Sequence, residues 1–191
     1  MYLLSIDSET GGLDYAKFSL LTFTMSVVDE NSKIIDTLNL KLKPDDGVYH
    51  LSAESMKVNR INIVEHDLNA RKYSEMKNNV ASFIYKNYSM YGKLTVLGQN
   101  CGFDLDNLFY YLIDKNTWYQ YVDRRVIDLI SISKLLQFKG LIPEDQELNL
   151  QKLCGFWGIE VDESITHTSD FDSQLNVELW KKYKSLDIKI A

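Results

Sequence analysis

The alternation of apolar and polar residues predicts three strands at the start of the chain. An apolar run at residues 3–6 is followed by two glycines at 11–12, as in a short buried strand that ends in a tight turn. Residues 18–29 are rich in β-branched and aromatic types, and residues 34–42 alternate between apolar and polar types. A turn at residues 31–32 separates these two runs, so we expect an antiparallel meander.

After this meander the apolar period becomes helical. One short buried strand at 94–97 is closed by Gly98. The segment at 51–73 shows little beyond Ser52 as a candidate helix cap. Three strands followed by strands that alternate with helices imply an α/β fold, a mixed sheet covered by helices, in one domain over residues 1–191. Helices are predicted at about 74–91, 105–112, 126–138 (with Asp128 as a plausible N-cap), 148–156 and 169–184.

Composition narrows the class of protein. The 191 residues are 45% apolar and 25% charged, as in an ordinary soluble globular protein. No run of eighteen apolar residues and no signal-like start is found, so we expect a soluble, cytoplasmic protein that does not bind membranes. Cys101 and Cys154 lack metal-ligand spacing and are expected to be reduced core thiols. The net charge of −6 argues against coating of long nucleic acid, although it permits a grip on a short end through metal ions.

The first predicted strand ends in acids. Because side chains alternate along a strand, Asp7 and Glu9 share one face and Ser8 lies on the other. Two carboxylates held at about 4 Å in a partly buried site repel by about 4 kcal/mol at an effective dielectric of about 20. A hard divalent ion such as Mg²⁺, bound through oxygen alone, relieves that repulsion. The alternative is an exposed hairpin rim, where neighbouring acids cost little.

Two further sites contain residues that suit either a functional or a purely structural role. Asp104 follows the strand that ends at Gly98, at a strand-to-helix junction of the kind that favours ligand residues, although it would also suit a helix cap. His167 and Asp172 stand at the entrance of the last predicted helix. They suit a general base beside a metal ligand, or ordinary chemistry at a helix N-terminus.

Taken together, three motifs occur in a fixed order. D-x-E-T is present at residues 7–10, N-x-x-F-D at 100–104, and H-x₄-D at 167–172. In these motifs and their spacing the chain resembles the DEDDh (DnaQ-like) 3′–5′ exonuclease family of the ribonuclease-H-like superfamily. The related Y-x₃-D pattern would need a tyrosine in place of Thr168. The likeness covers most of the chain, but residues 44–73 match poorly.

The resemblance implies a fold, an activity and a set of residues. The fold would be a ribonuclease-H-like mixed sheet, an antiparallel meander plus parallel strands, flanked by helices. The activity would be metal-dependent hydrolysis of phosphodiester bonds from the 3′ end of single-stranded or frayed DNA or RNA, releasing nucleoside 5′-monophosphates. Two ions, Mg²⁺ or Mn²⁺, would be held by four acids, with His167 as general base. The acids are Asp7, Glu9, Asp104 and Asp172, and the residues on the substrate side are Thr10, Gly11, Gly12, Leu13, Asn100 and Phe103.

Two departures from the family motifs lie at the substrate end, and some alternatives stay open. Gly11 replaces the second threonine that is common after D-x-E-T, and Gln99 stands where a histidine often precedes the asparagine, which leaves the nucleotide preference open. Asn100 is expected to order the backbone rather than to ligate an ion. Rival interpretations are a binding module that kept the fold without turnover and a metal-dependent endonuclease. A polymerase or a second copy of this chain stays open as a partner.

Helix geometry selects between two neighbouring acids. Asp170 and Asp172 are two residues apart and therefore lie about 200° apart around a helix. Leu175 and Leu179 lie three and seven residues beyond Asp172, on an apolar stripe that must face the core. We therefore expect Asp172 to point inward and Asp170 to be exposed.

Overall fold

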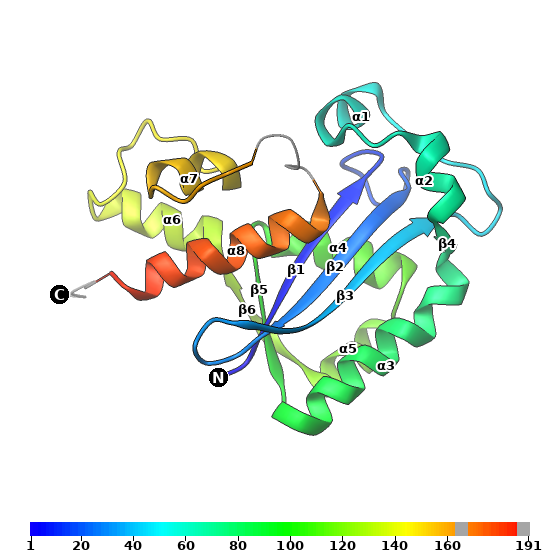
Figure 1. The fold of residues 1–191 in the computed structure, drawn as a ribbon, viewed down its shortest axis with the longest axis horizontal. Coiled ribbons are helices and arrows are strands. Elements are labelled where there is room, and N and C mark those ends of the chain that lie inside the picture. Colours follow the sequence, from blue (N-terminus) through cyan, green and yellow to red (C-terminus); the bar gives the residue numbers. More distant parts are fainter. Residues whose placement is uncertain (163–167, 187–191) are drawn as a thin grey trace.

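The computed structural model describes residues 1–162 and 168–186 and shows a mixed six-stranded sheet flanked by helices (Figure 1). The strand order is β4-β3-β2-β1-β5-β6, which places β1 in the interior of the sheet. This ribonuclease-H-like α/β architecture is the fold class that the sequence predicted. The strands span Leu3–Thr10 (β1), Leu20–Val28 (β2), Ile34–Lys43 (β3), Arg71–Lys72 (β4), Leu94–Gly98 (β5) and Val122–Asp128 (β6).

The strands on the two sides of β1 run in different directions. On one side β1, β2 and β3 form the predicted antiparallel meander, with Leu3 opposite Val28 and Met25 opposite Leu38. On the other side β5 is parallel to β1, and β6 is parallel to β5. The C-terminal ends of β1 and β5 therefore lie at the same edge of the sheet, from which α4 starts.

Helices cover both faces of the sheet. In Figure 1, α3 and α5 lie on one side of it, whereas α6, α7 and α8 lie on the other. Within the described residues, no helix is both long enough and apolar enough to cross a membrane. The helices span Ala53–Asn59 (α1), Ile63–Asn69 (α2), Tyr73–Tyr91 (α3), Cys101–Tyr111 (α4), Lys115–Tyr121 (α5), Leu129–Phe138 (α6), Leu150–Phe156 (α7) and Ser169–Lys184 (α8).

One predicted helix begins too early. Val126 and Ile127 were expected to be helical, but they belong to β6, where they pair with Val96 and Leu97 of β5. Strand pairing takes up this apolar pair before the helix starts. Asp128 then caps α6, as predicted, by accepting from the backbone N–H groups of the residues two and three positions later.

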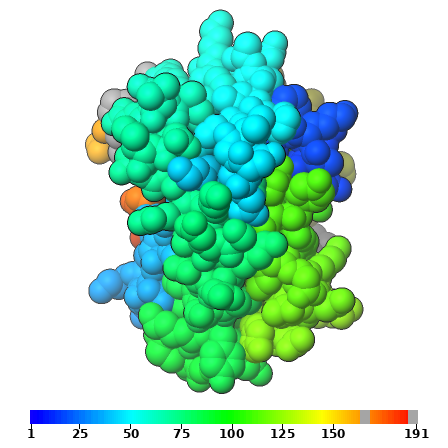
Figure 2. Space-filling model, turned by 90° about the vertical axis from the view of Figure 1, so that its right-hand side faces the viewer, coloured from blue at the N-terminus to red at the C-terminus, as the bar shows by residue number. Residues whose placement is uncertain are grey.

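The segments that the sequence left unassigned also contain helices. Residues 51–73 form α1, α2 and the short β4, and Ser52 caps α1 as expected. The helix α5 was not predicted, although Asp114 caps it. Figure 2 shows the face covered by α3, with the segment that leads into α1 (cyan) beside the loop that follows β1 (dark blue). Backbone hydrogen bonds from Ser19 to His50 and from Ser52 to Gly11 join these two segments.

Candidate active site

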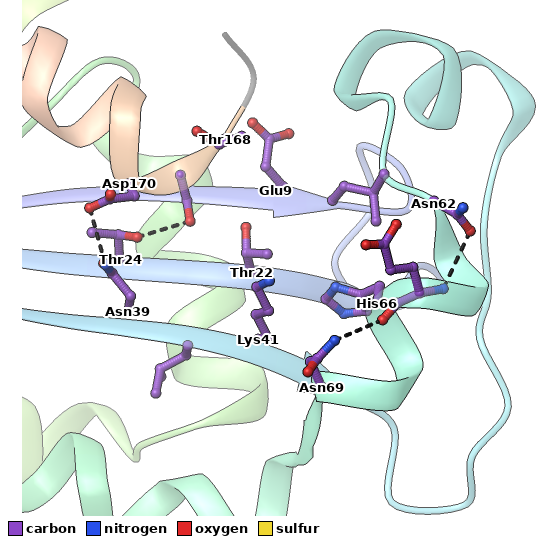
Figure 3. A pocket seen from close by; sticks show the side chains of 14 residues that line it. Glu9, Thr22, Thr24, Asn39, Lys41, Asn62, His66, Asn69, Thr168 and Asp170 are labelled. Carbon is purple, nitrogen blue, oxygen red and sulfur yellow. Dashed lines mark hydrogen bonds between the residues drawn. The ribbon is translucent and has the colours of Figure 1, made fainter. Parts of the chain in front are cut away.

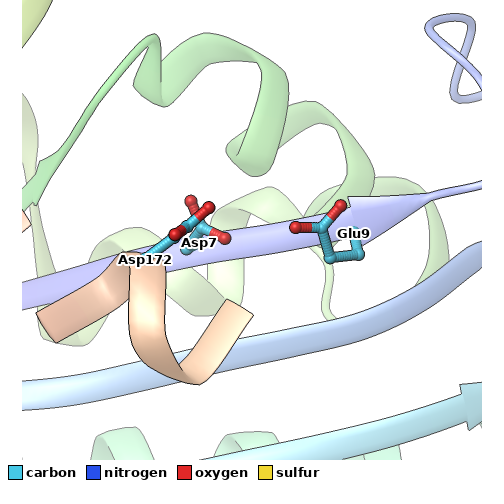
Figure 4. A group of neighbouring side chains, drawn as sticks. All are labelled: Asp7, Glu9 and Asp172. Carbon is cyan, nitrogen blue, oxygen red and sulfur yellow. The ribbon is translucent and has the colours of Figure 1, made fainter. Parts of the chain in front are cut away.

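Three carboxylates meet where β1 approaches the first turn of α8. Asp7 and Glu9 lie on the same face of β1, and Asp172 reaches them from α8 (Figure 4). One oxygen from each of these residues lies within 4.8 Å of the others. Asp172 is only 6% exposed, so α8 points this acid inward. Strand alternation and helix phase together thus assemble the group.

The first turns of α8 are held on the sheet by hydroxyl groups. The Ser5 hydroxyl donates to the backbone oxygen of Ser173 at 2.9 Å, and the Ser173 hydroxyl donates to that of Ser26 at 3.3 Å. One turn earlier, the hydroxyls of Thr24 and Ser169 are 2.9 Å apart. Such small polar side chains let the helix lie close to the strands, and each bond fixes the position of the turn that carries Asp172.

The fourth acid, Asp104, reaches the site from the opposite face of β1. It lies in the first turn of α4 and is 4% exposed, and the hydroxyl of Ser8 donates to its Oδ1 at 2.6 Å. Asn100 precedes the helix in the left-handed conformation, at φ 59°, which asparagine tolerates better than most residues. The backbone N–H of Cys101 donates to the Asp128 carboxylate at 2.9 Å. This junction fixes the start of α4 and with it the position of Asp104.

Burial and mutual repulsion disfavour the ionised forms of these acids. Burial, followed by the charges of Asp104, Asp172 and Glu9, raises the pKa of Asp7 well above its ordinary value. The pKa of Glu9 rises to about 9 through burial and the charges of Asp172 and Asp104. Burial also raises the pKa of Asp104 to about 7, although the Ser8 hydrogen bond opposes this effect.

This arrangement fits a divalent cation. In the part of the chain that the structure describes, no ion pair joins Asp7, Glu9 or Asp104 to a lysine, arginine or histidine. The donors are carboxylate oxygens, which are the ligands that hard cations such as Mg²⁺ and Mn²⁺ prefer. Asp7, Glu9 and Asp172 could ligate one ion directly, and Asp104 could serve a second one from the other side of β1.

A cavity of about 520 Å³ opens beside the acids, and Glu9 is part of its wall. It brings together three residues that the sequence placed on the substrate side, Thr10, Leu13 and Phe103. Leu13 is 86% exposed and therefore free to contact a ligand. The rest of the lining includes residues from the poorly matched segment that the sequence did not identify, namely Ser52, Glu54, Ser55, Val58 and Asn59. Their only sequence signal was the helix cap at Ser52.

The two glycines shape this cavity without lining it. A Cβ atom on Gly11 would lie 2.3 Å from the backbone oxygen of His50, and one on Gly12 would lie 2.3 Å from the Phe18 ring. The second threonine that is common after D-x-E-T therefore has no room here, because the segment before α1 occupies its space. Gln99, the other departure, donates to the backbone oxygen of Leu148 at 2.8 Å and so links β5 to the loop before α7.

A second cavity, of about 410 Å³, lies on the other side of Glu9 (Figure 3). It covers the open face of β2 and β3 between α2 and the start of α8, and Asp170 and Thr168 contribute to its wall. Asp170 is partly exposed and accepts a hydrogen bond from Asn39 at 3.1 Å. Ser173 and Val177, three and seven residues beyond Asp170, are buried, so α8 packs into the molecule over a wide arc.

His167 lies outside the described residues. Its neighbour Thr168 precedes α8 and lines the second cavity together with Glu9. Both cysteines are buried and unpaired, as expected for core thiols.

Neither a family model nor a curated protein sequence matches the chain. Solved structures do match it, and structures of exonuclease I, which have a ribonuclease-H-like fold, are among them. The zinc-bound complex of the E. coli enzyme with single-stranded DNA has a TM-score of 0.78 at 20% identity, covering 97% of this chain and 41% of that one.

Two further exonuclease I structures show a similar likeness to this chain. E. coli exonuclease I with a dT13 oligonucleotide has a TM-score of 0.77 at 19% identity, over 96% of this chain and 41% of that chain. Exonuclease I from Methylocaldum szegediense has a TM-score of 0.75 at 20% identity, over 97% and 41%. The chain thus spans about two fifths of the length of these neighbours. The resemblance to DnaQ-like exonucleases that the motifs suggested is therefore confirmed for the fold.

Proposed function

We propose that this protein is a metal-dependent 3′–5′ exonuclease of the DEDDh type that releases nucleoside 5′-monophosphates from single-stranded or frayed ends. The observation that carries the proposal is the convergence of four acids beside a cavity. Asp7, Glu9 and Asp172 lie within 4.8 Å of one another, Asp104 approaches from the other face of β1, and the cavity of about 520 Å³ adjoins Glu9. A loss of function would leave these buried acids with an electrostatic cost and no compensating role.

We assign a separate role to each group of residues in the proposed site. Two divalent ions, Mg²⁺ or Mn²⁺, would be held by the four acids, and when bound they would acidify the attacking water and stabilise the leaving 3′ oxygen. His167 is proposed to accept the proton of that water, since an ordinary histidine titrates near pH 6.5. Phe103 would stack on the terminal base, a contact that contributes about 1–3 kcal/mol, and Leu13 would wedge against the same base.

Single-stranded DNA is the first substrate to test. The E. coli neighbour binds a dT13 oligonucleotide, and other exonuclease I structures carry product or zinc with single-stranded DNA. The net charge of −6 suggests that the chain by itself releases long strands often. We further propose that residues 1–191 act as one exonuclease domain in the cytoplasm, with nucleic acid 3′ ends as the partner.

The test is a panel of substrates with Mg²⁺ or Mn²⁺. Single-stranded DNA, single-stranded RNA, duplex and a dinucleotide, each 5′-labelled, are incubated with the protein, and a closed circle is incubated in a separate assay. We expect a ladder that shortens from the 3′ end, release of 5′-monophosphates and strong inhibition by a 3′-phosphate. Cutting of the closed circle would indicate an endonuclease, and binding without any product would indicate the silent module; either result overturns the proposal.

The role of His167 has its own test. His167→Ala is expected to lower the rate by about 10²–10⁴-fold, the range for a positioned acid–base group, while metal binding is kept. The wild-type rate should rise with pH through the ordinary range of histidine. A variant with the wild-type rate and pH profile would assign the base elsewhere.

A further inference from the structure

Ser8 breaks the apolar pattern of one face of β1. Leu4 and Ile6 precede it on that face, and both are fully buried in the core. By alternation the next position should also be apolar, since it too faces the helices that pack there. A serine stands there instead, at the point where α4 brings a buried acid against the strand.

The contact between the two residues is short and directed. The Ser8 hydroxyl donates to Oδ1 of Asp104 at 2.6 Å, within the range for a hydroxyl that donates to a carboxylate. Such charge-assisted bonds are about twice as strong as those between neutral groups. Asp104 is 4% exposed, whereas Ser8 is partly exposed at the cavity, so the bond is shielded from water on the side of Asp104.

A bond to one oxygen constrains the whole carboxylate. The last torsion of an aspartate is broad, so an unassisted carboxylate can rotate about it. The Ser8 hydroxyl holds Oδ1, and backbone N–H groups of Ser8 and Asp104 also act on this carboxylate. Among these hydrogen bonds the hydroxyl has the largest effect, so it contributes most to the orientation of the group. Asp7, Glu9 and Asp172 form the tight group of three, whereas Asp104 stands apart from it on the other face. The orientation of Asp104 therefore needs a support of its own.

We propose that Ser8 is a positioning residue that orients Asp104 toward a divalent ion. This proposal rests on the proposed function only in assuming that the acids bind metal. Ser8 also lines the cavity beside Glu9, so a direct contact with substrate is the rival role. The two roles differ in what they predict, because orientation of a ligand affects metal binding without substrate.

The experiment measures Mn²⁺ binding to the substrate-free protein, by electron paramagnetic resonance of free Mn²⁺ and by the Mn²⁺ dependence of the melting temperature. Ser8→Ala is expected to weaken one binding step by about 10–100-fold, the usual effect of losing a partner that orients a ligand. Ser8→Thr keeps the hydroxyl and should bind close to wild type. Ser8→Cys keeps the size but donates weakly, so it should behave like Ser8→Ala.

Ser133→Ala is the matched control. Its hydroxyl is also buried and makes contacts of 2.6 Å with the Leu129 backbone oxygen and the Tyr183 hydroxyl, but on α6 and α8 away from Asp104. It should lower stability while leaving Mn²⁺ binding unchanged. The melting temperature of each metal-free variant shows that it is folded before binding is compared.

Several outcomes would overturn the proposal. Wild-type Mn²⁺ binding by Ser8→Ala would contradict it. An equal loss of binding in Ser8→Thr and Ser8→Ala would indicate packing instead of the hydroxyl. An increase in KM with unchanged Mn²⁺ binding would assign Ser8 to substrate. If wild type binds Mn²⁺ yet degrades no nucleic acid, the proposed function fails while the Ser8 comparison still stands.

Discussion

The two faces of the sheet around β1 and β2 are held by different kinds of contact. On the face toward α3, α4 and α5, buried apolar side chains such as Phe23, Met25 and Trp118 form a continuous core. On the face toward the start of α8, the contacts next to the acids are hydroxyl to hydroxyl or hydroxyl to backbone, as between Ser5 and Ser173.

The two kinds of contact contribute differently to the stability of the fold and to the alignment of the acids. Apolar burial is strong but has little directional preference, so a neighbouring side chain can adjust when one is changed. A net hydrogen bond contributes only about 0.5–1.5 kcal/mol, yet it has a preferred length and angle. Farther from the acids, the face toward α8 also carries an apolar cluster, which includes Leu175 and Leu179. We infer that the apolar contacts supply most of the free energy of folding and that the hydroxyl contacts beside the acids, here called the polar face, fix Asp172 against Asp7 and Glu9.

The largest expected effect comes from the acids themselves. The pKa of Glu9 is raised from 4.5 to about 9, and that of Asp104 is raised from 3.8 to about 7. Between its unfolded and its folded pKa, each group keeps a proton in the folded protein that the unfolded chain has released. Metal-free stability should therefore be greatest below about pH 4.5 as far as these groups are concerned, and should fall as the pH rises toward 9.

The measurement is chemical denaturation without metal across that pH range. Mn²⁺ should reverse the trend, because ions bind the deprotonated acids. Asp7→Asn should flatten the metal-free profile, melt at the same or a higher temperature than wild type, and gain less from Mn²⁺. A wild-type metal-free stability that is constant or increases over this range would show that the acids do not repel one another as described.

Next in size is a truncation on the apolar face. Trp118 of α5 is fully buried in the core on this face. Trp118→Ala should lower the free energy of unfolding by about 3–5 kcal/mol. Mn²⁺ affinity, measured well below the melting temperature, should stay near wild type. A large loss of Mn²⁺ affinity would contradict the separation of roles.

A smaller loss of stability is expected on the polar face. Ser173 is fully buried and its hydroxyl contacts those of Ser5 and Ser26. Ser173→Ala should cost about 1 kcal/mol. Because Ser173 follows Asp172 directly, the Mn²⁺ midpoint should nevertheless increase more than in Trp118→Ala. An equal or smaller metal effect than that of Trp118→Ala would mean that the hydroxyl contacts do not align the acid.

Much of this arrangement could be predicted from local patterns. The meander follows from alternation at 34–42, and α8 follows from its apolar spacing. The inward position of Asp172 follows from Leu175 and Leu179. These features depend on residues near one another in the chain. The early start assigned to α6 was wrong because the apolar pair at 126–127 suits a strand or a helix equally, and only its pairing with β5 decides between them.

Other features depend on contacts between distant segments. The sequence shows that Gly11 departs from the family motif, but not that the His50 backbone fills the space. It shows a serine at position 8, but not that Asp104, 96 residues away, accepts its hydrogen bond. The part of α1 that lines the cavity beside Glu9 belongs to a segment with no readable period and only one helix cap.

The most direct test of the active site compares Asp172→Asn with Asp170→Asn. Both replace an acid in the first turn of α8, but Asp172 meets Asp7 and Glu9, whereas Asp170 contacts Asn39. The measurement is degradation of a 5′-labelled single strand at fixed Mn²⁺. We predict that Asp172→Asn is inactive and that Asp170→Asn retains nearly the full rate, losing about 0.3–1 kcal/mol of stability through the helix dipole. An active Asp172→Asn beside an inactive Asp170→Asn would contradict the assignment of the metal ligands.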